Sequence, residues 1–112
     1  MSLTSTVMNN ARIVTVNVER IDAAMAIQFK EDMRAETEAP PDRVILDLSA
    51  VTFVDSSGLG AIVAAMKQLG DHRRLDLAGL TPVVDKVFRL TRMDTVFKLF
   101  PSLEDALTTL DG

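Results

Sequence analysis

The sequence has no cysteine, no tryptophan and no tyrosine, and its 112 residues include a single histidine. Without cysteine there is no disulfide framework and no thiolate metal site, which is typical of a reducing compartment. Metal sites also need clustered histidine or carboxylate side chains, and the sequence contains no such cluster. We therefore expect a cytoplasmic protein that holds neither a metal nor another cofactor.

Long apolar runs are missing as well. The longest apolar segment, Gly58 to Met66, is far shorter than the roughly 20 residues that cross a bilayer. The first ten residues, MSLTSTVMNN, do not place a basic region before an apolar run, as a secretory signal would. We expect no membrane span and no secretory signal.

Positive charge is scarce. Lys and Arg number 12 against 16 Asp and Glu, which gives a net charge of −4, and Arg73-Arg74 is the only adjacent basic pair. Affinity for nucleic acid comes from clustered basic side chains. We therefore exclude nucleic acid as a partner and expect a protein partner with a basic docking surface.

Signatures of catalysis are also absent. The sequence has neither GxxxxGK[ST] nor GxGxxG, the loops that cradle nucleotide phosphates. A Ser-His-Asp device needs a histidine, and His72 stands in the polar loop GDHRR, far along the chain from Ser56. We do not expect an enzyme.

The remaining pattern predicts one α/β domain over residues 1–112, because strands alternate with helices and the chain is long enough for a core. The order is β-β-α-β-α-β-α-β-α, with right-handed crossovers and a mixed sheet. The first half is expected to form strands at 4–8 and 11–18 around a turn at Asn9-Asn10, a helix capped by Asp22 and stopped by Pro40-Pro41, and a central strand at 43–48, after which Phe53 and Val54 return to the core. A helix opening at Ser56 or Ser57 and a strand at 74–78 follow, and then a helix that starts at Pro82 after the cap Thr81 and carries Val83 and Leu90 on its apolar face. The chain is expected to close with a short strand near 96–100 and a last helix that is capped by Ser102 and packed by residues up to Leu110.

The helix that opens at Ser56 or Ser57 has two apolar faces. Its inner face carries large side chains at spacings of three and four, namely Leu59, Ile62, Val63, Met66 and Leu69. Its other face is small: Gly60, Ala61, Ala64 and Ala65. Helix composition alone leaves two interpretations open, a docking surface for a partner or close packing within the domain.

The segment Asp55-Ser56-Ser57-Gly58 begins this helix. Ser and Asp are preferred N-caps, so capping is the favoured interpretation of the four residues in isolation. Their position after a buried strand adds a functional one, because loops at the carboxyl ends of strands carry ligand sites in α/β sheets.

The same residues belong to a longer resemblance. The run LDLSAVTFVDSSGLGAIVAAMKQL resembles the signature of the STAS domain, specifically of bacterial anti-sigma factor antagonists. The segment ERIDAAMAIQFKEDM and the C-terminal half from LDLAGLTP onward are similar to that family too. The resemblance implies a single STAS domain with a mixed four-to-five-stranded sheet and about four surrounding helices.

The resemblance also implies a function by partner switching. The unphosphorylated form would bind an anti-sigma factor that is itself a serine kinase. This binding would free the sigma factor that the anti-sigma factor had held. Phosphorylation of Ser56 would abolish binding, and a metal-dependent serine phosphatase would restore it. Asp22 would lie near Ser56, Ser57 would be the structural cap, and we expect a monomer. The expected partner surface comprises Asp22, Asp55, Ser57, Gly58, Gly60, Ala61 and Ala64.

Two residues depart from the family pattern, since Val18 and Arg92 stand where glycine is common. A second function remains open: a STAS interaction subunit or scaffold that is not phosphorylated, for example in an ABC-type lipid transport complex. A neighbouring gene for a serine kinase or for an ABC-type ATPase would distinguish the two.

Overall fold

A five-stranded sheet forms the centre of the molecule in the computed structural model, which describes residues 2–108. The strand order is β1-β2-β4-β6-β7; only the β1–β2 pair is antiparallel. The strands are β1 (Leu3–Met8), β2 (Ala11–Val16), β4 (Arg43–Asp47), β6 (Arg74–Ala78) and β7 (Leu99–Phe100). The mixed sheet and the β-β-α-β-α-β-α-β-α order of the principal elements are therefore confirmed.

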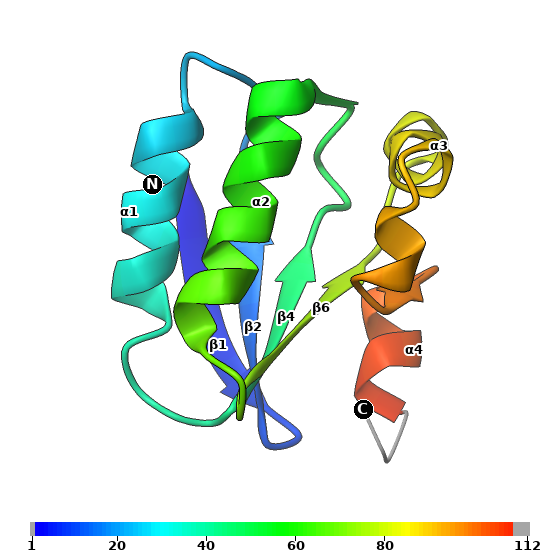
Figure 1. The fold of residues 1–112 in the computed structure, drawn as a ribbon. Coiled ribbons are helices and arrows are strands. Elements are labelled where there is room, and N and C mark those ends of the chain that lie inside the picture. Colours follow the sequence, from blue (N-terminus) through cyan, green and yellow to red (C-terminus); the bar gives the residue numbers. More distant parts are fainter. Residues whose placement is uncertain (1, 109–112) are drawn as a thin grey trace.

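Four helices surround this sheet (Figure 1). They are α1 (Ala26–Glu36), α2 (Ser56–Leu69), α3 (Pro82–Leu90) and α4 (Leu103–Thr108), with a 3₁₀ turn, η1 (Met93–Thr95), after α3. Helices α1 and α2 lie side by side across one face of the sheet, whereas α3 and α4 lie beyond β6 (Figure 1). The expected packing of Leu110 falls outside the described residues.

The core has a large and a small part because side chains alternate between the two faces of the sheet. The large part lies under α1 and α2 and includes Val14, Val44, Leu46, Leu75 and Leu77, all buried. The small part lies on the other face, where Ile13, Ile45, Ala78 and Phe100 meet Ala106 of α4. Strand β4 is thus covered on both faces, as its continuous apolar sequence predicted.

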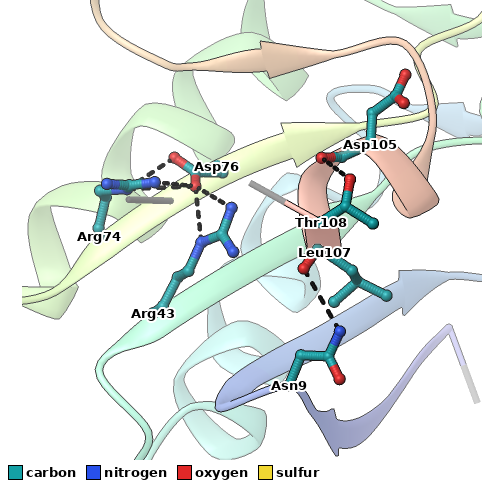
Figure 2. Close-up of polar contacts among 7 residues, drawn as sticks. All are labelled: Asn9, Arg43, Arg74, Asp76, Asp105, Leu107 and Thr108. Atoms are coloured by element: carbon teal, nitrogen blue, oxygen red, sulfur yellow. Dashed lines mark hydrogen bonds and ion pairs between the residues drawn. The ribbon is translucent and has the colours of Figure 1, made fainter. Parts of the chain in front are cut away.

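Several turn and cap predictions are confirmed. Asn9 and Asn10 have φ values of 52° and 60° and form the β1–β2 turn. Asn9 Nδ2 also donates to Leu107 O (3.4 Å), which connects this turn to α4 (Figure 2). Ser102 Oγ accepts a hydrogen bond from Asp105 N (3.1 Å), so Ser102 caps α4. Each turn is therefore specified by residues within it.

Arg92, where the family commonly has glycine, has the left-handed backbone that favours glycine, with φ 64° and ψ 22°. Replacing it with glycine should raise the free energy of unfolding by about 0.5–1 kcal/mol and the melting temperature by about 3–6 °C. Arg92→Ala is the matched control, because it removes the side chain but keeps the unfavourable backbone. Thermal unfolding checks this; an equal gain in both variants would contradict it.

Arginine side chains near the starts of β2 and β6 hold the loop between α1 and β4. Arg73 donates to Thr37 O (2.7 Å) and Pro41 O (3.0 Å), and Arg12 donates to Pro40 O (3.0 Å). Prolines have no N–H of their own to tie a loop down. Arg73, half of the only adjacent basic pair in the sequence, therefore has a structural role.

Candidate functional site

A second, two-stranded sheet builds the site. Strands β3 (Arg20–Ile21) and β5 (Phe53–Val54) pair in parallel, with Arg20 opposite Phe53 and Ile21 opposite Val54. The next residue of each strand is an aspartate, so the pairing brings Asp22 beside Asp55 at the start of α2. Strands of two residues are too short to give a pattern, and for that reason the sequence did not predict this sheet.

Asp55 fastens the two strands and the helix together. It occupies the N-cap of α2 with extended backbone, and its Oδ1 accepts from Gly58 N (2.8 Å). Its Oδ2 accepts from Ala23 N (3.2 Å) in the turn that carries Asp22. The expectation that Ser57 caps the helix is wrong, because the Asp55 carboxylate already does so.

Asp22 does not cap α1, contrary to the expectation. The helix begins at Ala26, and Met25 at its N-cap makes no side-chain bond. Instead, Asp22 Oδ1 accepts from Ala24 N (3.1 Å), and Arg20 Nε donates to Asp22 Oδ2 (3.3 Å). Asp22 thus forms its own turn, which the pairing of β3 with β5 holds against Asp55.

Ser56 and Ser57 are the first two residues of α2, and both are exposed. Within residues 2–108 neither hydroxyl makes a hydrogen bond. Their backbone N–H groups also have no partner inside the helix, as at every helix start. An anionic group on Ser56 would therefore find free donors and the positive end of the helix dipole.

Gly58 is buried because the first turn of α2 lies directly on β3. A Cβ at this position would stand 1.9 Å from Ile21 O, a carbonyl that already accepts from Asp55 N. The Ile21 carbonyl belongs to the backbone and cannot rotate away from an added Cβ as a flexible side chain could. Gly58 therefore packs within the domain and is removed from the expected partner surface.

Gly58→Ala should lower the free energy of unfolding by about 2–3 kcal/mol, because the helix must move off β3. Gly60→Ala is the matched control two residues along α2, where a Cβ would meet nothing within 4 Å. There alanine should be neutral or stabilise by up to about 1 kcal/mol. Urea unfolding of both variants measures the difference, and equal effects would contradict the packing argument.

The small face of α2 proves to be divided. Ala61 and Ala65 are each only 3% exposed and belong to the core, so close packing within the domain is correct for them. Ala61 therefore leaves the expected partner surface. Gly60 is exposed, and Ala64 is half-buried beside a cavity of about 150 Å³ next to Lys30 and Arg34 of α1. Small residues here let α1 and α2 approach closely.

Sequence reasoning missed two residues at this end of the molecule. Phe53 was expected in the core, but it is 36% exposed, and the guanidinium of Arg20 lies 4.0 Å from its ring centre. Arg20 and Asp22 also line a depression of about 590 Å³. The sequence does show a cation, Arg20, two residues before Asp22. Its contact with Phe53 follows only from the pairing of β3 with β5, which places Arg20 opposite Phe53.

Two other kinds of feature are absent from residues 2–108. No helix in this range has the length and apolarity needed to cross a membrane. Nor does the range hold three or more metal-ligating side chains gathered at one place. The site is therefore a surface of serines, carboxylates and one arginine at the start of α2.

Known proteins resemble this chain in sequence and in fold. RsfB of Mycobacterium tuberculosis, named an anti-sigma-F factor antagonist, is 29% identical over 112 residues, which cover 99% of this chain and 92% of that protein. The crystal structure of an anti-sigma factor antagonist from Mycobacterium paratuberculosis has a TM-score of 0.85 and 28% identity, covering 98% of this chain and 93% of the other. A STAS protein from Planctomyces limnophilus shares the fold, with a TM-score of 0.87, 18% identity and 98% of both chains covered. Residues 3–106 match the family described as STAS domain, and the chain therefore belongs to that family.

Proposed function

We propose that this STAS domain is an anti-sigma factor antagonist that acts in the cytoplasm by partner switching, and that Ser56 is its switch. Relatives that align along nearly the whole chain carry the name of anti-sigma factor antagonist. The observation that carries the proposal is the exposed Ser56 hydroxyl, which makes no hydrogen bond within the described residues and stands at the first position of α2. A kinase can reach it without unfolding any part of the domain.

The proposed cycle has a binding step and a chemical step. The unphosphorylated domain binds an anti-sigma factor that is a serine kinase, and the sigma factor is released. The kinase then directs Ser56 Oγ to the γ-phosphorus of ATP. An O–P bond forms, the bond from that phosphorus to the β,γ-bridging oxygen breaks, ADP leaves, and the hydroxyl proton passes to a base of the kinase. A metal-dependent phosphatase hydrolyses the ester and restores Ser56.

A phosphate on Ser56 should affect the fold and the interface oppositely. The free N–H groups of α2 and its dipole stabilise an anion by about 0.3–1 kcal/mol. The same group adds about −1.5 to −2 charges beside Asp22 and Asp55. Charge repulsion or burial in an interface costs several kcal/mol. Phosphorylation should therefore end binding and leave the monomeric domain folded.

The partner surface that we propose is called the switch surface and consists of Asp55, Ser56, Ser57, Gly60, the turn at Asp22 and, farther along α2, Ala64. These positions are exposed or half-buried, and all but Ala64 surround the start of α2. Gly58 and Ala61 support this surface from below. Its carboxylates suit the basic docking surface that the net charge of −4 favours.

The direct test incubates the protein with ATP and a candidate anti-sigma factor serine kinase, and maps the modified residue by mass spectrometry. We expect one phosphate, on Ser56. Ser57→Ala is the matched control, because its hydroxyl is equally exposed, and this variant should still be modified, whereas Ser56→Ala should not. Label on Ser57 in the wild-type protein would overturn the site. Tight kinase binding without any phosphate transfer would favour the non-switching interaction module.

A further inference from the structure

We propose that Arg20 binds the phosphate on Ser56, so that modification draws this arginine away from Asp22 and Phe53. The inference rests on the proposed phosphorylation and adds a rearrangement to it. Arg20 lies on β3 and is 60% exposed at its side chain. It is also the only Lys or Arg in the two segments that form the site, residues 17–25 and 48–58.

The side chain of Arg20 contacts Asp22, and the turn at Asp22 reaches the N-cap of α2 through the hydrogen bond from Ala23 N to Asp55 Oδ2. Arg20 Nε contacts Asp22 Oδ2, two residues farther along the chain, so the side chain extends in the direction in which β3 runs. Its guanidinium also lies over Phe53, the residue opposite it on β5. The two contacts place the cation beside Asp22 and over Phe53, the first residue of β5, which stands three residues before Ser56 in the chain.

The guanidinium has donors to spare. Nε is its only atom with a hydrogen-bonding partner within residues 2–108, and the Nη1 and Nη2 groups carry four further N–H donors. One flat face is covered by Phe53, which holds the group in a fixed orientation. A planar fork of this kind matches the oxygens of a phosphate and binds them through two parallel hydrogen bonds.

The surrounding charges favour a contact between Arg20 and the phosphate over its present contact with Asp22. Glu19, Asp22 and Asp55 are the carboxylates of the same two segments, and they repel a phosphate dianion. Asp22 offers Arg20 one negative charge, which it shares with the N–H of Ala24. A phosphoserine offers close to two charges and three oxygens. Arg20 should therefore exchange Asp22 for the phosphate when both are within reach.

The exchange would change what a partner meets. Departure of Arg20 uncovers the ring of Phe53 and leaves Asp22 with the Ala24 N–H alone. Phosphorylation would thus alter the aromatic and acidic features of the switch surface in addition to adding charge. This rearrangement is local, because β3 is paired by backbone hydrogen bonds that do not involve the Arg20 side chain.

The test measures the second pKa of the phosphate by ³¹P NMR titration. Phosphoserine is installed at position 56 during synthesis, so that no kinase is needed and failure of the proposed kinase reaction remains a separate result. A nearby cation favours the dianion and lowers this pKa from its ordinary value near 6. We expect Arg20→Gln to raise the phosphate pKa by about half a unit, and Arg20→Lys to raise it less.

Two controls make the result specific. Arg34→Gln removes an exposed arginine from the last turn of α1. This turn is at the end of α1 opposite to the turn at Asp22, so the phosphate pKa should stay unchanged. Unmodified Arg20→Gln should melt within a few degrees of the wild type, since its ion pair is exposed. The Arg20 Nε–Hε NMR signal should shift on phosphorylation. An unchanged phosphate pKa in Arg20→Gln, or an Nε–Hε signal that does not respond, would overturn the proposal.

Discussion

Replacing Asp76 with alanine is expected to lower the free energy of unfolding by about 3–5 kcal/mol, a large share of the roughly 5–15 kcal/mol that holds a domain together. Asp76 lies in the middle of β6 and is 1% exposed. Its Oδ2 is 3.1 Å from Arg43 Nε and 2.7 Å from Arg74 Nη2, and its Oδ1 is 3.1 Å from Arg74 Nε (Figure 2).

The loss of stability in Asp76→Ala arises from the two arginines that remain, Arg43 and Arg74. The Arg43 side chain is 17% exposed, and its Nη2 lies 3.1 Å from Asp76 Oδ2 without the alignment of a hydrogen bond, so this carboxylate supplies its charge compensation. Arg74 is 42% exposed and can turn into water. Without Asp76, Arg43 keeps an unpaired, mostly buried charge beside the small part of the core, next to Phe100.

Urea unfolding of Asp76→Ala and of three further variants separates charge from packing. Asp76→Leu alone should be strongly destabilised, and adding Arg43→Met should recover most of the loss, since removing both charges removes the penalty. Asp85→Ala breaks a surface pair with Arg89 and should leave the free energy nearly unchanged. A loss below about 1 kcal/mol for Asp76→Ala, or no recovery in the double variant, would contradict this account.

Phosphorylation of Ser56 should weaken binding to the anti-sigma factor at least 100-fold, because each 1.4 kcal/mol of interface cost is tenfold in affinity. Ser56→Asp brings one charge instead of nearly two and should weaken binding about tenfold. Both forms should melt within a few degrees of the wild type, since the start of α2 accepts an anion. Isothermal titration calorimetry and thermal unfolding measure the two effects.

A control at another helix start isolates the role of position. Ser102→Asp adds the same charge at the cap of α4, where aspartate is also a good N-cap, and should change neither affinity nor melting temperature. If Ser56→Asp unfolded the domain or bound as tightly as the wild type, the switch surface would be misplaced.

The fold could be predicted because its signals are local. Asn9 and Asn10 tolerate positive φ, Ser102 caps its own helix, and the alternation of strands and helices determines the topology. The turn and the cap depend on residues a few positions apart, and the alternation can be read directly along the chain.

The site was only partly predictable because it depends on contacts between distant segments. The pairing of β3 with β5 involves two residues on each strand, yet it determines the neighbours of Asp22 and the exposure of Phe53. Ala61 and Ala65 of α2 are buried in the large part of the core, whereas Ala64 between them is half-buried. Val83 and Leu90, expected to be buried in α3, are 61% and 73% exposed, since only the side of α3 that carries Val84 and Phe88 meets the core.

We propose that the domain releases a sigma factor when Ser56 is unphosphorylated and does not when Ser56 is phosphorylated. The most direct measurement is release of fluorescently labelled sigma factor from its complex with the anti-sigma factor, titrated with either form of this protein. We predict full release by the unphosphorylated form, and none by the phosphorylated form at the same concentrations. Equal release by both forms, or no release by either, would contradict the account.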